Sequence, residues 1–198
     1  MSDQAAELER PPIPDRPLLR GERVWLRPLE RRDLPAYVAG INDTDVGGWA
    51  GYTFPFNVEM SVHWLDEVQE KMGKGTGYFF AVCELGDDRF IGTIWLNHVN
   101  THHANAELAI YMDRDHIGAG WGTDAQRVLL DFGFNTLRME RVYLTVDAEN
   151  ARAIRSYEKV GFKKEGVMRR SWQMRGKLSD SVLMAILRDE WQEHAELP

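Results

Sequence analysis

The chain has 198 residues, of which 43% are hydrophobic and 28% are charged, and its formal net charge is −7 at pH 7. This length suits one domain with a substantial core, and the acidic balance argues against general nucleic-acid binding. No apolar run approaches the roughly 20 residues of a membrane span, and the acidic, polar start lacks the pattern of a signal peptide. We therefore expect a cytoplasmic protein that binds neither nucleic acid nor membrane.

The first 17 residues differ in composition from the rest of the chain. They contain four prolines and little apolar content, which predicts a flexible N-terminal arm at 1–17 and a single domain at 18–198. The single cysteine, Cys83, excludes an internal disulfide and fits a reducing compartment.

The first half of the domain predicts two helices between strands. Alternating residues favour a first strand from Arg23, and Asp33 then caps a helix that ends near 41. After a loop rich in glycine and aromatic residues, Asn57 caps a second helix that ends at Gly73 to Gly75. The apolar face of this second helix is made of Met60, Trp64, Leu65 and Val68.

A meander of three strands follows, at 78–85, 89–99 and 106–112. The period then changes to that of a helix, which begins near Gly122, and a strand at 141–146 and a helix at 151–160 come next. Two strands near 162–170 and 180–187 close the chain. This order predicts an α/β fold of the α+β type, in which helices flank a mixed, mostly antiparallel central sheet.

Three glycines at 118–122 join the strand at 106–112 to the following helix. Bare backbone before a helix N-terminus offers free N–H groups and a positive dipole end, which suits a phosphate, although the glycines alone also fit a tight turn. A nucleotide-triphosphate loop is excluded, because Thr123 and Asp124 follow Gly122 where that motif has Lys and then Ser or Thr. A dinucleotide-binding loop matches Gly120, Gly122 and Ala125, but the preceding meander is unlike that fold.

The third class of ligand is coenzyme A. The stretch GAGWGTDA at 118–125 resembles the pyrophosphate loop of the GNAT acetyltransferases, and NARAIRSYEKVGFKKEGVMRR at 150–170 resembles their second motif. The ending of the chain resembles the RimJ/RimL-like branch of that family, and the resemblance covers about 23–191. One residue departs from the pattern, since Ile117 stands where the family often has Gln or Arg.

The resemblance implies a GNAT-like domain that uses acetyl-CoA as co-substrate, with no metal. The residues that it assigns to the coenzyme are Ile110, Tyr111, Met112, Ile117, Gly118, Ala119, Gly120, Trp121, Gly122, Thr123, Asn150, Arg152 and Tyr157. Arg155 is a further candidate for the phosphates. The backbone N–H of Ile110 or Met112 would polarise the thioester carbonyl.

Aminolysis of a thioester needs a base for the ammonium of the acceptor and a proton for the leaving thiolate. By resemblance, Glu107 is the base, acting directly or through water, and Tyr157 is the acid. A structural carboxylate on a strand and a packed aromatic on a helix are the alternatives at these two positions.

Several other residues have plainer interpretations. His98, His102 and His103 lack the spacing of a metal site, so we expect solvated loop histidines. Cys83 lies in an apolar strand, which favours a buried, inert thiol and direct transfer of the acyl group. Four aromatic residues between the first two helices either line an acceptor pocket or pack the loop: Trp49, Tyr52, Phe54 and Phe56.

The sequence does not select the acceptor amine, since fold alone does not determine it. Protein N-termini, polyamines, aminoglycosides and other small amines are acceptors among the proteins that this chain resembles, and homodimers are common among those proteins. A coenzyme-binding sensor without turnover and an NAD-dependent oxidoreductase are the other functions that stay open.

Overall fold

The structure is a computed structural model, and it describes residues 13–14, 17–50, 55–174 and 177–195. Its strands form one sheet in the order β1-β2-β3-β4-β5-β6-β8-β7, in which β5 and β6 are parallel and the other neighbours antiparallel. The expected mixed, mostly antiparallel sheet is therefore confirmed. The strands are β1 (Leu19–Arg20), β2 (Val24–Pro28), β3 (Tyr78–Glu84), β4 (Phe90–Asn100), β5 (Asn105–Met112), β6 (Arg141–Asp147), β7 (Lys163–Met174) and β8 (Lys177–Leu187).

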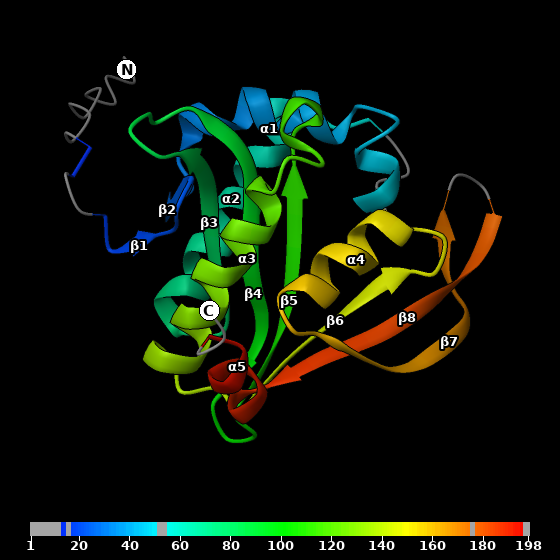
Figure 1. Cartoon of the computed structure of the whole chain (residues 1–198). Helices are drawn as coiled ribbons and strands as arrows, with labels where there is room; N and C mark the ends of the chain where they lie inside the picture. Colours follow the sequence, from blue (N-terminus) through cyan, green and yellow to red (C-terminus); the bar gives the residue numbers. More distant parts are fainter. Residues whose placement is uncertain (1–12, 15–16, 51–54, 175–176, 196–198) are drawn as a thin grey trace, which may run out of the picture.

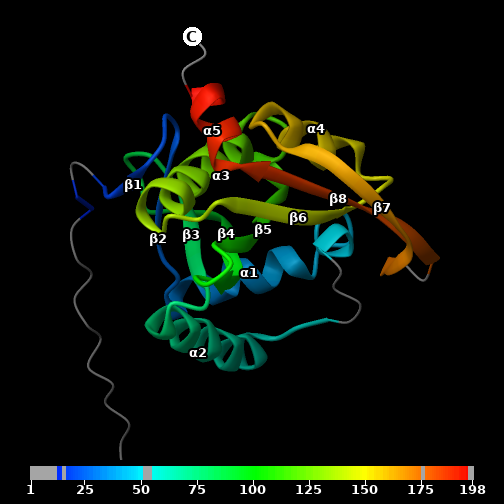
Figure 2. The ribbon, with the colours of Figure 1, turned by 90° about the horizontal axis from the view of Figure 1, so that it is seen from below.

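Helices cover both faces of the sheet (Figures 1 and 2). Figure 2 shows α1 (Leu34–Ile41) and α2 (Val58–Lys74) on one face, and α3 (Trp121–Asp131), α4 (Ala151–Lys159) and α5 (Arg188–Ala195) on the other. The larger core lies under α3 and α4, where strand residues such as Ile94 and Leu108 meet Leu129. Smaller clusters lie under α2, around Leu65, and under α1, around Tyr37.

The structure departs from the predicted elements at a few places. The short strand β1 and the helix α5 have no strong periodic pattern, and α5 is held by Trp191, whose ring stacks 6.1 Å from that of Phe134. Helix α3 gives way to one π-helical turn at Phe132–Thr136. Met60 is 42% exposed, because it lies in the first turn of α2, whereas Leu65 and Val68 are buried against the sheet. The predicted arm at 1–17 lies outside the described residues except for 13, 14 and 17.

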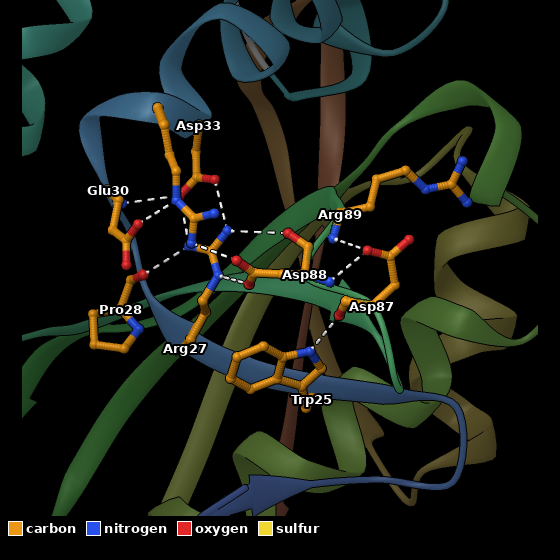
Figure 3. A network of polar contacts seen from close by, with 9 residues as sticks. Trp25, Arg27, Pro28, Glu30, Asp33, Asp87, Asp88 and Arg89 are labelled. Carbon is orange, nitrogen blue, oxygen red and sulfur yellow. Dashed lines mark hydrogen bonds and ion pairs between the residues drawn. The ribbon is translucent and has the colours of Figure 1, made fainter. Parts of the chain in front are cut away.

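A buried ionic network fastens the start of α1 to the sheet (Figure 3). The guanidinium of Arg27 on β2 donates two hydrogen bonds of 2.8 Å to Asp33 and one of 2.6 Å to Asp88 in the β3–β4 turn. All three residues are at most 6% exposed. Asp33 stands at the N-cap position of α1 as expected, but its carboxylate caps no helical N–H and binds Arg27 instead.

The protonation of Arg27 follows from these contacts. Burial alone would lower the pKa of Arg27. The hydrogen bonds to Asp33, the negative charge of Asp33 and the hydrogen bond to Asp88 outweigh burial and raise this pKa above its ordinary value. Two carboxylates therefore share one permanently charged guanidinium. Asp88 also pairs with the half-exposed Arg32, so removal of Arg27 would leave Asp33 as the buried carboxylate without a cation among the described residues.

We predict that Arg27→Met lowers the free energy of unfolding by about 3–5 kcal/mol, because it leaves the buried carboxylate of Asp33 without its cation. Arg31→Met is the matched control, because Arg31 pairs with Asp66 on the surface, where the two side chains are 68% and 54% exposed. This substitution should lower the free energy of unfolding by less than about 1 kcal/mol. Urea unfolding of both variants measures the difference, and equal losses would contradict a structural role for the network.

Candidate active site

The site begins where β5 and β6 separate. The two strands pair in parallel at Asn105 with Arg141, Ala106 with Val142, and Glu107 with Tyr143. Beyond Glu107, β5 continues to pair with β4 on its other side, while its edge toward β6 opens. Figure 1 shows the two strands diverging like the arms of a V, with α4 beside the opening.

The backbone of β5 presents hydrogen-bonding groups to this opening. The N–H of Asp113, just after β5, donates to the carbonyl of Ile91 on β4. Because successive peptide groups point to opposite edges of a strand, the N–H groups of Ile110 and Met112 point toward β6. Both N–H groups are thus directed to the opening. The sequence alone did not show whether the N–H of Ile110 or that of Met112 would face it.

The loop after β5 holds the glycines in conformations that a side chain would strain. Gly118 has φ 87° and Gly120 has φ 92°, and a Cβ on either would meet no protein atom within 4 Å. These two positions therefore require glycine for their backbone and not because of neighbouring protein atoms. Gly120 is also the N-cap of α3 and supplies no side-chain cap, so the first N–H groups of that helix point to the loop without a partner in the helix.

Asp124 and Arg23 anchor this loop and the start of α3 to the N-terminal end of β2. The carboxylate of Asp124 accepts hydrogen bonds from the backbone N–H groups of Arg23 at 2.8 Å, Val24 at 3.1 Å and Glu22 at 3.2 Å. The Arg23 guanidinium donates to the carbonyl of Ala119 at 2.8 Å and lies 5.7 Å from the ring centre of Trp121. In the sequence, Asp124 only served to exclude a nucleotide-triphosphate loop. In the structure, its carboxylate positions the start of α3 against the residues at the beginning of β2.

His116 is a further anchor that the sequence did not single out. Its Nδ1 lies 2.5 Å from Asp113 and its Nε2 lies 3.2 Å from Glu84 on β3, and its ring packs edge-on against Trp121. The only sequence signal was an Asp three residues before a His, which is too common to be informative.

A pocket of about 480 Å³ occupies the opening and extends over the loop. Most of the residues predicted for the coenzyme line it: Ile110, Tyr111, Met112, Ile117, Gly118, Gly120, Gly122, Thr123, Asn150, Arg152 and Tyr157. Arg155 and Lys159 on α4 add positive charge to the same pocket. Ala119 and Trp121 belong to the loop but not to the lining.

Helix α4 brings the Tyr157 ring to the pocket. The side chain of Asn150 caps α4 by accepting a hydrogen bond of 3.1 Å from the N–H of Ala153, and Tyr157 follows on the buried face. Its ring packs against Phe162, and among the described residues its hydroxyl makes no hydrogen bond. Burial raises the pKa of Tyr157 to about 12, so the phenol keeps its proton at neutral pH.

Glu107 lies at the closed end of the opening, in the last residue pair that β5 shares with β6. Its side chain is 30% exposed and lies 3.7 Å from Nε2 of His98, outside the pocket lining. Burial and then the charge of Glu107 raise the pKa of the adjacent Tyr143. The structure does not bring Glu107 into contact with Tyr157, and the role of Glu107 as base stays a prediction.

The other singled-out residues divide between surface and core. Cys83 is buried, and burial raises the pKa of its thiol to about 12, so it is no nucleophile at neutral pH. His102 and His103 are exposed on the turn after β4. Trp49 lines the pocket and Phe56 packs against the cluster under α1, while Tyr52 and Phe54 lie outside the described residues.

In the described segments no group of three His, Cys, Asp or Glu side chains can hold a metal ion, and no helix there is long and apolar enough to span a membrane.

Comparison with known proteins gives one family. The model of the acetyltransferase (GNAT) domain matches residues 23–163. The probable N-acetyltransferase YjcK of Bacillus subtilis is 29% identical over 176 residues, which cover 86% of this chain and 97% of that protein. The spermidine N(1)-acetyltransferase of Escherichia coli K12 is 29% identical over 177 residues, which cover 88% of this chain and 91% of that protein.

Solved structures agree with this result. The spermidine N-acetyltransferase of Vibrio cholerae in complex with CoA and spermine has a TM-score of 0.77 and 25% identity, covering 85% of this chain and 98% of that one. RimJ of Mycobacterium smegmatis, in complex with CoA-disulfide, has the same fold, with a TM-score of 0.77 and 24% identity over 84% of this chain and 83% of that one.

We predict that Gly120→Val lowers acetyl-CoA affinity by about 100-fold, because the branched side chain occupies the space above the loop and disturbs N–H groups that face a charged ligand. Gly86→Val is the matched control: Gly86 has φ 84° and no protein atom within 4 Å of a Cβ, but lies in the β3–β4 turn. Both variants carry the same backbone penalty. Calorimetry with acetyl-CoA separates them, and equal affinities would remove the phosphate-binding role of the loop.

Proposed function

Because the chain belongs to the GNAT acetyltransferase family and is an acetyl-CoA-dependent N-acetyltransferase, we propose that it transfers the acetyl group directly to a primary amine within this pocket. One observation carries the proposal: the glycine loop before α3 and the hydroxyl-bearing Tyr157 of α4 line one pocket in the opening between β5 and β6.

The coenzyme fits the described residues in three parts. The pyrophosphate lies on the loop 117–123, where free N–H groups and the positive end of the α3 dipole replace cationic side chains. Arg152 contacts a phosphate from α4. The pantetheine lies along β5, where the N–H groups of Ile110 and Met112 bind its acyl end and polarise the thioester carbonyl.

The reaction needs two proton transfers around one bond exchange. The amine nitrogen attacks the thioester carbon, an N–C bond forms and the C–S bond breaks, which gives an acetamide and the free thiol of CoA. Glu107 accepts one of the two protons that the acceptor ammonium loses, directly or through water. Tyr157 donates its hydroxyl hydrogen to the sulfur as negative charge develops there, and the second proton from the amine nitrogen restores the phenol.

An acyl-enzyme intermediate is not part of this proposal. Its obvious carrier would be a thiol, and Cys83 is buried in β3 with a raised pKa. The runner-up function is a coenzyme-binding sensor without turnover. Steady release of CoA in the presence of an amine distinguishes the two.

Several finer expectations stay predictions. Relatives that act on spermidine support a small amine as acceptor, while the RimJ structure supports the RimJ/RimL-like branch by its fold without supplying an acceptor. The cytoplasmic location and the homodimer rest on the sequence and on family resemblance. Sedimentation of the purified chain measures whether it forms a homodimer.

We predict that the two proton transfers separate by pH. With an excess of amine, Tyr157→Phe should lower CoA release by about 100-fold equally from about pH 6 to about pH 9, because a phenol with a pKa of about 12 stays protonated throughout this range. Glu107→Gln should lower it most at the acidic end and recover toward the alkaline end, where the acceptor amine loses its proton without help.

Acetyl-CoA affinity, measured by calorimetry, serves as the control and should stay within about 3-fold of the wild type for both variants. Wild-type rates for both variants across the range would show that these residues have no proton role. A wild-type protein that binds the coenzyme but releases no CoA with any amine would favour the sensor.

A further inference from the structure

Asp147, the last residue of β6, is a buried carboxylate whose charge has no cationic partner among the described residues. It lines the pocket although it is 4% exposed. Its oxygens accept hydrogen bonds from the N–H of Glu149, at 2.8 Å, and from the hydroxyl of Ser179. An ionised carboxylate has room for about four hydrogen bonds, so these two contacts orient the group and leave further acceptor capacity.

The strand register places Asp147 on a particular side of the sheet. Glu107 pairs with Tyr143, so residues at even spacing from these two share one face: Ala109 and Tyr111 on β5, and Thr145 and Asp147 on β6. Tyr111 packs under α1, so this is the α1 face. The proposed acid Tyr157 reaches the pocket from the opposite face, which carries α3 and α4.

Two indole rings line the same pocket near this end of β6. Trp172 comes from β7, where it pairs with Ser179, the residue whose hydroxyl binds Asp147. Trp49 comes from the short helical turn η2 (Gly47–Ala50), which both views place beside the ends of β6 and the β7–β8 hairpin (Figures 1 and 2). Indole faces attract alkylammonium ions, and most strongly in desolvated sites.

The pocket also contains cations, but they lie on another element. Arg152, Arg155 and Lys159 are spaced along α4, and none of them forms an ion pair with Asp147 among the described residues. In the proposed function this helix faces the phosphates of the coenzyme. A buried carboxylate without a counter-ion costs free energy, and a cation from the acceptor is the group left to offset that cost.

From this arrangement we infer that Asp147, with the indoles of Trp49 and Trp172, is a subsite for a second ammonium group of the acceptor. The inference rests on the proposed function, because it takes the reacting amine to lie near Glu107. Asp147 is four residues along β6 from Tyr143, the partner of Glu107, which is a rise of about 13 Å. The preferred acceptor is therefore a long, linear amine with positive charges at both ends.

The test uses two acceptors of equal length, 1,8-diaminooctane and n-nonylamine, which differ in whether the far end is an ammonium or a methyl group. The wild type should prefer the diamine. Asp147→Asn keeps an oxygen for the N–H of Glu149 but removes the charge, and should raise KM for the diamine at least about 10-fold, with kcat and the kinetics of nonylamine unchanged. Trp172→Leu should raise the same KM by about 3-fold.

Glu149→Gln is the matched control, since it removes a negative charge two residues away whose side chain is exposed, and it should change neither acceptor. A second measurement is calorimetric binding of 1,8-diaminooctane to the protein saturated with CoA, which Asp147→Asn should weaken at least about 10-fold.

If Asp147→Asn impairs the kinetics of both acceptors equally, the inference is overturned, and the role of Asp147 is to stabilise the β6–α4 turn. Unchanged kinetics with both acceptors would overturn it as well. If the wild type turns over no amine, the proposed function fails, but the calorimetric arm still decides the subsite: loss of diamine binding in Asp147→Asn supports it, and equal binding contradicts it.

Discussion

The parallel pairing of β5 and β6 is the constraint on which the site depends. Within the described chain, three residue pairs join these strands before they diverge, while β4 holds β5 along its other edge. An open strand edge normally exposes unpaired N–H and C=O groups. Here the edge forms the wall of a pocket, and a ligand with amide and carbonyl groups, such as pantetheine, can complete the hydrogen bonds that β6 leaves unmade. The opening therefore explains both the position of the pocket and the class of molecule that suits it.

The buried carboxylates of the described chain are compensated in three different ways. Asp33 and Asp88 share the guanidinium of Arg27, and Asp88 also pairs with Arg32, which fixes the start of α1. Asp124 receives three backbone N–H groups, which fix the loop before α3. Among the described residues, Asp147 receives two donors and no cation. The first two arrangements are complete without a ligand and are structural, whereas the third is incomplete, and this difference makes Asp147 a candidate for substrate recognition.

Local patterns in the sequence were sufficient for much of the fold, because the helices and strands here obey their own periodicities and caps. Asn57 caps the helix that it was expected to cap, and the glycine loop lies at the pocket. Contacts between distant segments carry no such local signal. Asp124 lies about a hundred positions from the N–H groups that it accepts, and His116 bridges β3 and the end of β5. Asp147 likewise required the strand register before its face and its neighbours were known.

The central claim is direct transfer within a complex that holds both substrates, and the pattern of initial rates tests it most directly. Rates of CoA release are measured against acceptor concentration at several fixed concentrations of acetyl-CoA. Direct transfer predicts double-reciprocal lines that intersect, because both substrates must be bound before either product leaves. Parallel lines are the pattern of a covalent acyl-enzyme, and together with an acetylated protein they would contradict the account.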